Sequence, residues 1–537
     1  MPPQGYRLSS DEVLAIADAL AKMRAVRAQY PGSYGGAYLS YPARWQVSYF
    51  SREGRKEIGQ VIIADETGRV LEQWTGFQVA WSMARGYPGA FGRHVDALYI
   101  WLPLCLLFMF PFVDLRRPLS LLHLDLLVLL SFSVSLAFFN HAHIYASVPL
   151  AYPPLIYLLV RMLVLMRPER AGGAGRRARL RVNVPTPWLA VGVVFLLGFR
   201  IGLNLTDSNV IDVGYAGVIG AQRIVDGRAL YGSYPANNEH GDTYGPVAYE
   251  AYVPFEQIFG FSGTWDDLPA AHAAAVVFDL LAVALLFLLG RRVRGPALGT
   301  ALAYAWVAYP FTLFTLDSNS NDVLVTILVL AAILFASSPP ARGLFAALAS
   351  LSKFAPVALV PLLATYELSE RRAAGPAERP RRRPSALALF LAALLATAAL
   401  VSIPALGHDS LHTIYERTIA YQADRGSPFS VWGLYGDLGG LQLAVQIAAV
   451  VLAVAVAFVR RRPGIAGLAA ACAAVMIAVQ LGVDHWFYLY IPWFFPLVML
   501  ALLGRSGDPQ APLTAVASAA ARSIRPASAV GIGSAPP

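Results

Sequence analysis

Long apolar runs, separated by short polar connections, dominate the chain from about residue 97 onward. A transmembrane helix needs about 20 mainly apolar residues to cross the hydrocarbon core of a bilayer. Runs of about this length fall at residues 97–113, 119–139, 144–166, 187–205, 270–290, 296–316, 323–336, 385–406, 438–459, 464–483 and 486–504. The pattern therefore predicts a mainly α-helical bundle that crosses the membrane many times.

A further apolar run, residues 344–366, is interrupted near its middle by Lys353 and Pro356. Basic segments at 337–342 and 371–383 flank it, and both should lie on the same side of the membrane. We therefore expect a broken hairpin, with a half-helix at 344–351, a turn at 353–356 and a returning half-helix, which brings the total to about 13 crossings. Irregular backbone at membrane depth is tolerated only beside protein or a water-filled cavity, so a cavity is expected around Lys353.

The first 95 residues are polar and predict a small α+β domain. Ser9-Ser10-Asp11-Glu12 is a helix start, and the helix should run through about residue 23. Short strands are expected at 45–50, 59–64 and 69–75, followed by a second helix at 77–85.

The order and size of these N-terminal elements resemble a PepSY-like domain. The resemblance is carried by the Gly-containing turn in Ile63-Ala64-Asp65-Glu66-Thr67-Gly68-Arg69-Val70-Leu71. A generic fold of one helix and three strands is the alternative.

Composition and charge agree with a membrane protein. Hydrophobic residues make up 57% of the 537 residues and charged residues only 14%, against about 25% charged in soluble proteins. The net charge of +9 comes from basic clusters between apolar runs, a placement that orients helices rather than one that binds nucleic acid. Cys105 and Cys472 both lie in apolar runs and indicate neither a disulfide framework nor a metal site.

The basic clusters also predict the orientation of the chain. Arginines gather at 116–117, 167–181, 291–294, 371–383 and 460–462, and these segments should be cytoplasmic, together with the C-terminus. The long connection 206–269 and the loops at 407–436 and around Asp484 should then be extracytoplasmic. The predicted organisation is a domain at 1–95, a three-helix accessory module at 96–186, a core at 187–504 and a disordered tail at 505–537.

On this count the N-terminal domain also lies outside the membrane, although no apolar segment precedes it. Two explanations remain open. The true start lies upstream and supplies an export signal, or the domain is cytoplasmic and the count of spans before residue 167 is wrong by one.

The outer connection 206–269 combines acids, tyrosines and Gly/Pro turns, which suits sugar binding. Carboxylates accept hydrogen bonds from sugar hydroxyls, and aromatic faces stack on the apolar faces of a pyranose. The candidate sugar- or acceptor-binding residues here and in later outer loops are Tyr215, Tyr231, His240, Asp242, Tyr244, Asp322 and His485.

Several short motifs resemble membrane glycosyltransferases of the GT-C superfamily. In order they are Asp212-Val213-Gly214-Tyr215, a Gly-x-x-x-Tyr segment ending at Tyr231, Tyr252-Val253-Pro254, Asn321-Asp322, Lys353-Phe354-Ala355-Pro356 and the loop from Arg425 to Trp432. The nearest branch is the polyprenol-phosphate-mannose-dependent α-mannosyltransferases, and the resemblance covers roughly residues 187–504.

This resemblance implies a mannose-like sugar carried on a polyprenyl phosphate and transferred at the extracytoplasmic face of a bacterial cell membrane. An acid in the first outer loop would deprotonate the acceptor hydroxyl of an envelope glycan, glycolipid or protein. Asp212 occupies the matching position, with Asp207 as second choice, and a helix N-cap is the structural alternative for Asp212. The family's polyprenyl-phosphate users generally need no metal, and no cofactor is expected beyond the lipid-linked co-substrate.

The leaving phosphate needs a cation, and such stabilisation is strongest in a low-dielectric site. Lys353 is the first candidate because it is the lysine of the membrane part, where charges are costly and usually functional. Simple snorkelling or a structural salt bridge is the alternative. Arg425 and Arg417 are weaker candidates for the donor phosphate. Arg200 is a further candidate, although pairing with Asp207 or Asp212 is its favoured interpretation.

Histidines on the predicted outer side, including His408 and His412, match no metal-ligand spacing, so no metal site is expected. The aromatic run 486–495 is expected to form an interfacial belt, or else to line the donor groove.

Two other classes of function remain open. A transporter would also contain intramembrane charges and a broken helix, but no second copy of the Lys353 interruption marks a repeated half. A membrane sensor or assembly scaffold is favoured mainly by the N-terminal domain. Incorporation of labelled sugar from a polyprenyl donor separates glycosyl transfer from both.

Overall fold

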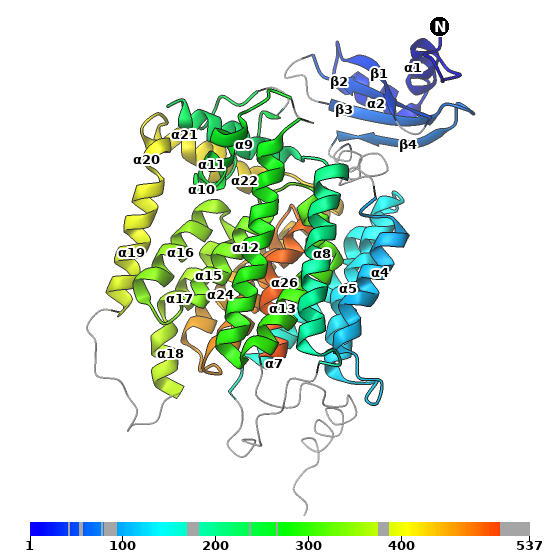
Figure 1. The fold of residues 1–537 in the computed structure, drawn as a ribbon. Helices are drawn as coiled ribbons and strands as arrows, with labels where there is room; N and C mark the ends of the chain where they lie inside the picture. Colours follow the sequence, from blue (N-terminus) through cyan, green and yellow to red (C-terminus); the bar gives the residue numbers. More distant parts are fainter. Residues whose placement is uncertain are drawn as a thin grey trace, which may run out of the picture.

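A computed structural model describes residues 1–40, 43–52, 57–76, 79, 94–168, 182–235, 238–264, 267–373 and 386–504. It contains a small N-terminal domain beside a large helical bundle (Figure 1). Four predicted features lie wholly or largely outside these residues. They are the helix at 77–85, the arginine clusters at 167–181 and 371–383, and the tail at 505–537.

The N-terminal domain packs two helices against one antiparallel sheet. Its elements are α1 (Ser10–Asp18), α2 (Ala21–Gln29), β1 (Tyr34–Ser40), β2 (Arg44–Phe50), β3 (Glu57–Ala64) and β4 (Val70–Thr75), and the strand order is β1-β2-β3-β4. The three predicted strands are confirmed. The sequence analysis missed β1, whose Gly35-Gly36 pair weakens the strand pattern. The similarity to PepSY-like domains stays a prediction.

The start of α1 is as predicted, but its extent is not. Ser9 and Glu12 form a reciprocal capping box, in which the Glu12 carboxylate accepts from the Ser9 N–H at 2.8 Å. The helix ends at Asp18, and α2 starts after Leu20, so the single helix expected through residue 23 is two helices. Both place apolar residues on the core of Trp45, Val47, Val61 and Ile63.

The bundle contains the predicted apolar helices, many of them broken or short. Its main members are α4 (Leu98–Met109), α5 (Leu121–Asn140), α6 (Ile144–Leu150), α7 (Tyr152–Leu165), α8 (Thr186–Asp207), α12 (Pro269–Arg294), α13 (Pro296–Ala308), α14 (Pro310–Asp317), α15 (Asp322–Leu334), α16 (Pro339–Ser352), α17 (Val360–Ala364), α18 (Tyr366–Ala373), α19 (Ala386–Val401), α24 (Gly439–Phe458), α25 (Ile465–Gly482) and α26 (Ile491–Leu503). Within the described residues, six helices are long and apolar enough to cross a membrane, or seven if one bent pair counts as a span. This supports a multi-pass membrane protein. The total of about 13 crossings stays a prediction.

The bent pair is α13 and α14, which the sequence pattern had merged into one span at 296–316. Their axes differ by 59°. Pro310 causes the break because it has no N–H to donate and its ring clashes with a preceding helical turn. The bend turns α14 so that its end, at Asp317, reaches the loop that follows α8.

The broken hairpin at Lys353 is confirmed. Helix α16 ends at Ser352, and a 3₁₀ turn, η4 (Ala355–Leu359), begins the return through α17 and α18. Arg342, near the start of α16, lies 4.0 Å from Glu367 in α18, so both arms reach the same end of the bundle. Figure 1 shows α18 at the end remote from the outer-loop helices.

Two ion pairs hold helices together inside the bundle. Arg200 of α8 donates to Asp279 of α12 at 2.6 Å, and Arg161 of α7 binds both oxygens of Asp125 in α5 at 2.9 and 3.0 Å. The expected pairing of Arg200 with Asp207 or Asp212 is therefore wrong. Arg200 lies inside the bundle, where a fully buried guanidinium needs a buried partner from a neighbouring helix.

The aromatic run 486–495 does not form an exposed interfacial belt. Trp486, Tyr488 and Phe494 are buried, and the Tyr309 ring stacks on Phe495 at 4.0 Å. Helices α5 and α14 cover this segment, with Phe132 and Phe311 against Trp486 and Tyr488. The run is therefore part of the bundle's core.

The N-terminal domain lies at the same end of the bundle as the outer-loop helices (Figure 1). His94, in the connection to α4, forms an ion-pair contact with Asp207 at the end of α8. The basic end of α12, at Arg291–Arg294, lies at the other end of the bundle.

These placements predict opposite labelling of the two ends. The arginines at the end of α12 favour the cytoplasm, so the opposite end, which carries the N-terminal domain, should face outward. A cysteine replacing the exposed Thr67 of that domain should therefore react with a membrane-impermeant thiol reagent on intact cells. A cysteine replacing the exposed Arg291 should react only after lysis. Mass spectrometry of the labelled protein measures both, and the reverse pattern would invert the proposed orientation.

Candidate active site

Three interruptions of apolar helices meet near the N-terminus of α9 (Asp212–Val225). They are the break between α14 and α15 at 318–321, the break after α16 at Lys353, and the extended segment 483–487 between α25 and a 3₁₀ turn, η8 (Tyr488–Tyr490). Interrupted helices leave backbone groups to be satisfied locally, so such breaks at membrane depth line polar sites.

The segment after α8 is docked on the first of these breaks. The Ile211 N–H donates to the Ser318 carbonyl at 3.0 Å, and the Asn319 side chain donates to the Asn209 carbonyl at 2.8 Å. A side chain at Gly214 would place its Cβ 2.1 Å from the Asn319 carbonyl oxygen. Only glycine fits this approach, which fixes Asp212 at the first position of α9.

Asp212 lines a small cavity at this end of the bundle. The cavity has a volume of about 50 Å³ and is lined by Asp212, Val213, Ala216, Asn238, His240, Gly241, Thr243, Tyr244, Tyr421 and Arg425. The Asp212 side chain is open to it, and one carboxylate oxygen accepts from the Val213 N–H at 2.9 Å. Dense surrounding protein removes water from the carboxylate and raises the pKa of Asp212, although the nearby Arg425 and Lys353 charges oppose this shift.

Lys353 lies in a buried cage of aromatic rings. Its Nζ donates to Asp322 at 2.6 Å, and the Trp493 indole N–H donates to the same oxygen at 3.2 Å. The ammonium also lies over the rings of Tyr244, Tyr490 and Trp493, at 5.0, 5.6 and 5.4 Å from their centres. With only 5% of Lys353 exposed, the snorkelling alternative is wrong, and a salt bridge is what forms.

Tyr244 joins the lysine cage to the Asp212 cavity, because its ring borders both. Burial raises the pKa of Tyr244 well above its usual value, and the Asp212 charge adds to the shift, so the phenol stays protonated. Two acids, Asp212 and Asp322, and two cations, Arg425 and Lys353, thus act on one tyrosine.

Other predicted residues hold the outer loops in place. Arg417 makes a two-pronged ion pair with Asp242 at 2.8 and 2.6 Å, and Asp242 also accepts from the Gly232 N–H at 2.6 Å. The Tyr231 hydroxyl donates to the Tyr244 carbonyl at 3.0 Å. Tyr215 is buried against Phe261. None of these four predicted residues is among those that line the described cavity.

His485 and Asp207 occupy different surroundings. His485 shares a hydrogen bond with the Ser427 hydroxyl at 2.8 Å and packs on Phe429. Burial lowers the pKa of His485 well below its usual value, helped by the Arg425 and Lys353 charges, so the imidazole is neutral. Asp207 forms its contact with His94 at the end of α8 and does not line the Asp212 cavity.

The sequence analysis did not single out several residues of the site. Tyr421 stacks on His240 with ring centres 4.7 Å apart, and Tyr490 and Trp493 complete the lysine cage. Asn321 is buried, and neither polar atom of its side chain has a partner among the described residues. The signal for Tyr490 and Trp493 was the aromatic run at 486–495.

The described residues contain no group of three or more His, Cys, Asp or Glu side chains arranged to hold a metal ion. The expectation that catalysis needs no metal stays a prediction.

Comparison with known proteins shows that part of this site is similar to one glycosyltransferase family. The model of glycosyltransferase family 87 matches residues 243–483, a stretch that includes Tyr244, Asp322, Lys353, Arg425 and the loop up to Val483. No curated protein matches the chain significantly. Among solved structures, ArnT from Cupriavidus metallidurans bound to undecaprenyl phosphate aligns with 17% identity and a TM-score of 0.41, and the match covers 64% of this chain and 64% of ArnT.

The family match begins one residue before Tyr244 and spans both the Lys353 hairpin and the Arg425 loop. It leaves the N-terminal domain and Asp212 outside its limits. The family match agrees with the resemblance to membrane glycosyltransferases, and residues 243–483 of this multi-pass membrane protein are similar to glycosyltransferase family 87.

Proposed function

We propose that this protein transfers a mannose-like hexose from a polyprenyl-phosphate donor to an acceptor hydroxyl, at the end of the bundle that carries α9. The proposal is carried by one observation. An acid, Asp212, and a cation, Arg425, line the same cavity, and Lys353 lies next to that cavity over the ring of Tyr244. The lipid class rests on the motif resemblance at 212–215, 321–322 and 353–356.

In the proposed reaction, Asp212 acts as the general base. It takes the proton of the acceptor hydroxyl while that oxygen attacks the anomeric carbon of the donor sugar. The bond from the anomeric carbon to the phosphate oxygen breaks, and its electron pair leaves with the polyprenyl phosphate. A raised pKa makes Asp212 a stronger base than an ordinary aspartate, which suits proton abstraction near neutral pH.

The leaving phosphate gains negative charge as the bond breaks, and two cations are placed to stabilise it. Arg425 lines the cavity itself, and a guanidinium can bind two phosphate oxygens at once. Lys353 approaches the cavity past Tyr244 and is oriented by Asp322. Because protein surrounds both charges, their effect on the leaving group is larger than in water.

The remaining cavity walls suit a sugar. The stacked rings of His240 and Tyr421 give a flat aromatic surface. Asn238 donates one amide N–H to the Asp212 carbonyl at 2.9 Å, and its side-chain oxygen and second N–H are the groups that a sugar hydroxyl can bind. The acceptor class that fits this location is an envelope glycan, glycolipid or protein, and no cofactor is needed for the step.

The first functional prediction concerns the base. Asp212→Asn removes the proton acceptor but keeps the side-chain size, and should reduce transfer by roughly 10²–10⁴-fold with donor binding retained. In the wild type, activity should fall as the pH drops through the raised pKa of Asp212, because the protonated acid cannot accept a proton. Transfer of labelled sugar from a polyprenyl-phosphate donor in proteoliposomes measures both effects.

The matched control is Asp226→Asn, an exposed acid at the other end of α9. It should transfer sugar at the wild-type rate. Near-normal turnover of the Asp212 variant would remove this residue from the mechanism.

The second prediction concerns Arg425. Arg425→Gln should raise the KM for the donor and lower kcat, each at least about tenfold, because the guanidinium binds the phosphate and stabilises its developing charge. Arg228→Gln, which removes an arginine whose side chain is 69% exposed, serves as control and should leave both constants unchanged. Equal kinetics of the two variants would exclude a role for Arg425.

The third prediction separates a functional lysine from a structural one. Lys353→Met leaves Asp322 as a buried, unpaired charge, and should lower both thermal stability and donor affinity. The double variant Lys353→Met/Asp322→Asn removes the unpaired charge and should regain most of the stability but not the donor affinity. Thermal unfolding and donor binding in detergent measure the two properties. Recovery of donor affinity in the double variant would make Lys353 purely structural.

A further inference from the structure

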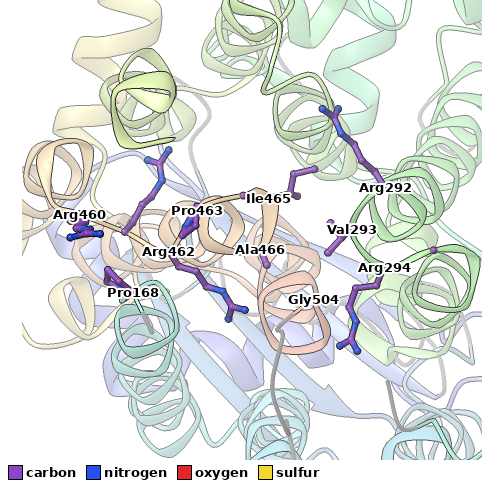
Figure 2. Close-up of a pocket in the computed structure, with 13 residues that line it drawn as sticks. Pro168, Arg292, Val293, Arg294, Arg460, Arg462, Pro463, Ile465, Ala466 and Gly504 are labelled. Carbon is purple, nitrogen blue, oxygen red and sulfur yellow. The ribbon is translucent and has the colours of Figure 1, made fainter. Parts of the chain in front are cut away.

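The end of the bundle remote from the candidate active site holds a second, larger cavity. Its volume is about 970 Å³, and it lies between the end of α12, the connection from α24 to α25, and the end of α26. Figure 2 shows Arg292 and Arg294 on one side of this cavity and Arg460 and Arg462 on the other. Helix α12, whose last residues line this cavity, has 26 residues and is therefore roughly 39 Å long at about 1.5 Å per residue.

The walls of this arginine pocket are rich in positive charge. Five arginines line it, namely Arg292, Arg294, Arg460, Arg461 and Arg462, and no acidic side chain does so among the described residues. The nearby Glu370 carboxylate is engaged by the Gly464 N–H, at 3.1 and 3.2 Å. Like charges that line one cavity repel one another, and an anion bound between them relieves that repulsion.

The surroundings of Arg461 give a second, independent indication that this pocket binds an anion. It is only 1% exposed, and its Nε and Nη1 have no hydrogen-bond partner among the described residues. Its Nη2 lies 3.5 Å from the Tyr366 carbonyl, and its guanidinium lies over the Tyr366 ring. A buried guanidinium with two unpartnered nitrogens is costly, so a ligand that supplies acceptors here would be bound strongly.

The size and shape of the pocket indicate the class of anion. Arginine forks bind phosphate oxygens in pairs, and the N-terminus of α25 also opens into this cavity at Ile465 and Ala466. The volume of about 970 Å³ lies at the upper end of the range for small-molecule pockets. The cavity is therefore larger than one inorganic phosphate would fill. Basic pockets between transmembrane helices at a membrane surface bind the phosphates of anionic lipid headgroups.

We propose that this arginine pocket binds an anion with two ionised phosphates, either a lipid headgroup that carries two phosphate groups or a water-soluble diphosphate. The site is separate from the proposed glycosyl transfer and does not depend on it. Bound there, the anion bridges α12 to the α24–α25 connection and neutralises Arg461, so it stabilises this end of the bundle.

The test uses the full-length protein in nanodiscs of phosphatidylcholine, with two probes. One probe is cardiolipin added to the bilayer, and its retention is measured by native mass spectrometry. The other is inorganic pyrophosphate in solution, and its binding is measured by calorimetry. At least one probe should bind, and it should raise the midpoint of thermal unfolding of the wild type by mass action. Binding of cardiolipin but not of pyrophosphate identifies the natural anion as a lipid headgroup. Binding of pyrophosphate identifies it as a soluble diphosphate.

The matched variants each remove one positive charge. Arg294→Gln and Arg462→Gln should weaken binding of the active probe at least about tenfold, because both residues line the pocket. Arg291→Gln changes the neighbouring, exposed arginine of the same helix that does not line it, and should bind as the wild type does. The proposal is overturned if neither probe binds, or if Arg291→Gln loses as much affinity as the pocket variants.

Discussion

The buried ion pair between Lys353 and Asp322 connects the interrupted helices on which the site depends. It joins the break after α16 to the first residue of α15, and Trp493 of α26 donates to the same carboxylate oxygen. Two charges removed from water are stable only when each is paired and hydrogen-bonded. The aromatic rings around Lys353 complete that environment. One of them, the ring of Tyr244, also lines the cavity of Asp212.

Near this pair, the surrounding protein and the neighbouring charges shift the pKa of the candidate base, Asp212, in opposite directions. Desolvation raises the pKa of Asp212, and the cations Arg425 and Lys353 pull it down. An acid and a cation therefore lie near one cavity, and their opposing effects set how readily the acid takes a proton. In the proposed reaction the same cations also stabilise the leaving phosphate, so one electrostatic arrangement serves both halves of that reaction.

The two ends of the bundle differ in chemistry. The end with α9 carries acids, tyrosines and the N-terminal domain, and its loops are tied by ion pairs such as Arg417 with Asp242 (Figure 1). The other end carries the arginine pocket of Figure 2, and no acidic side chain is among the described residues that line it. This difference agrees with the orientation that the basic clusters predict.

The sequence by itself determined the class of protein, the positions of most apolar helices and the break at Lys353, because these follow from local hydrophobic runs and from proline. It also identified Asp212, Arg425 and Tyr244, which one cavity brings together. It could not determine the partner of Arg200, which is Asp279, 79 residues away, or that Tyr490 and Trp493 enclose Lys353. Those contacts, and the burial of the aromatic run, depend on how helices pack against one another. Hydrophobic periodicity specifies that a helix forms, whereas only the tertiary structure decides which buried charge its side chains meet.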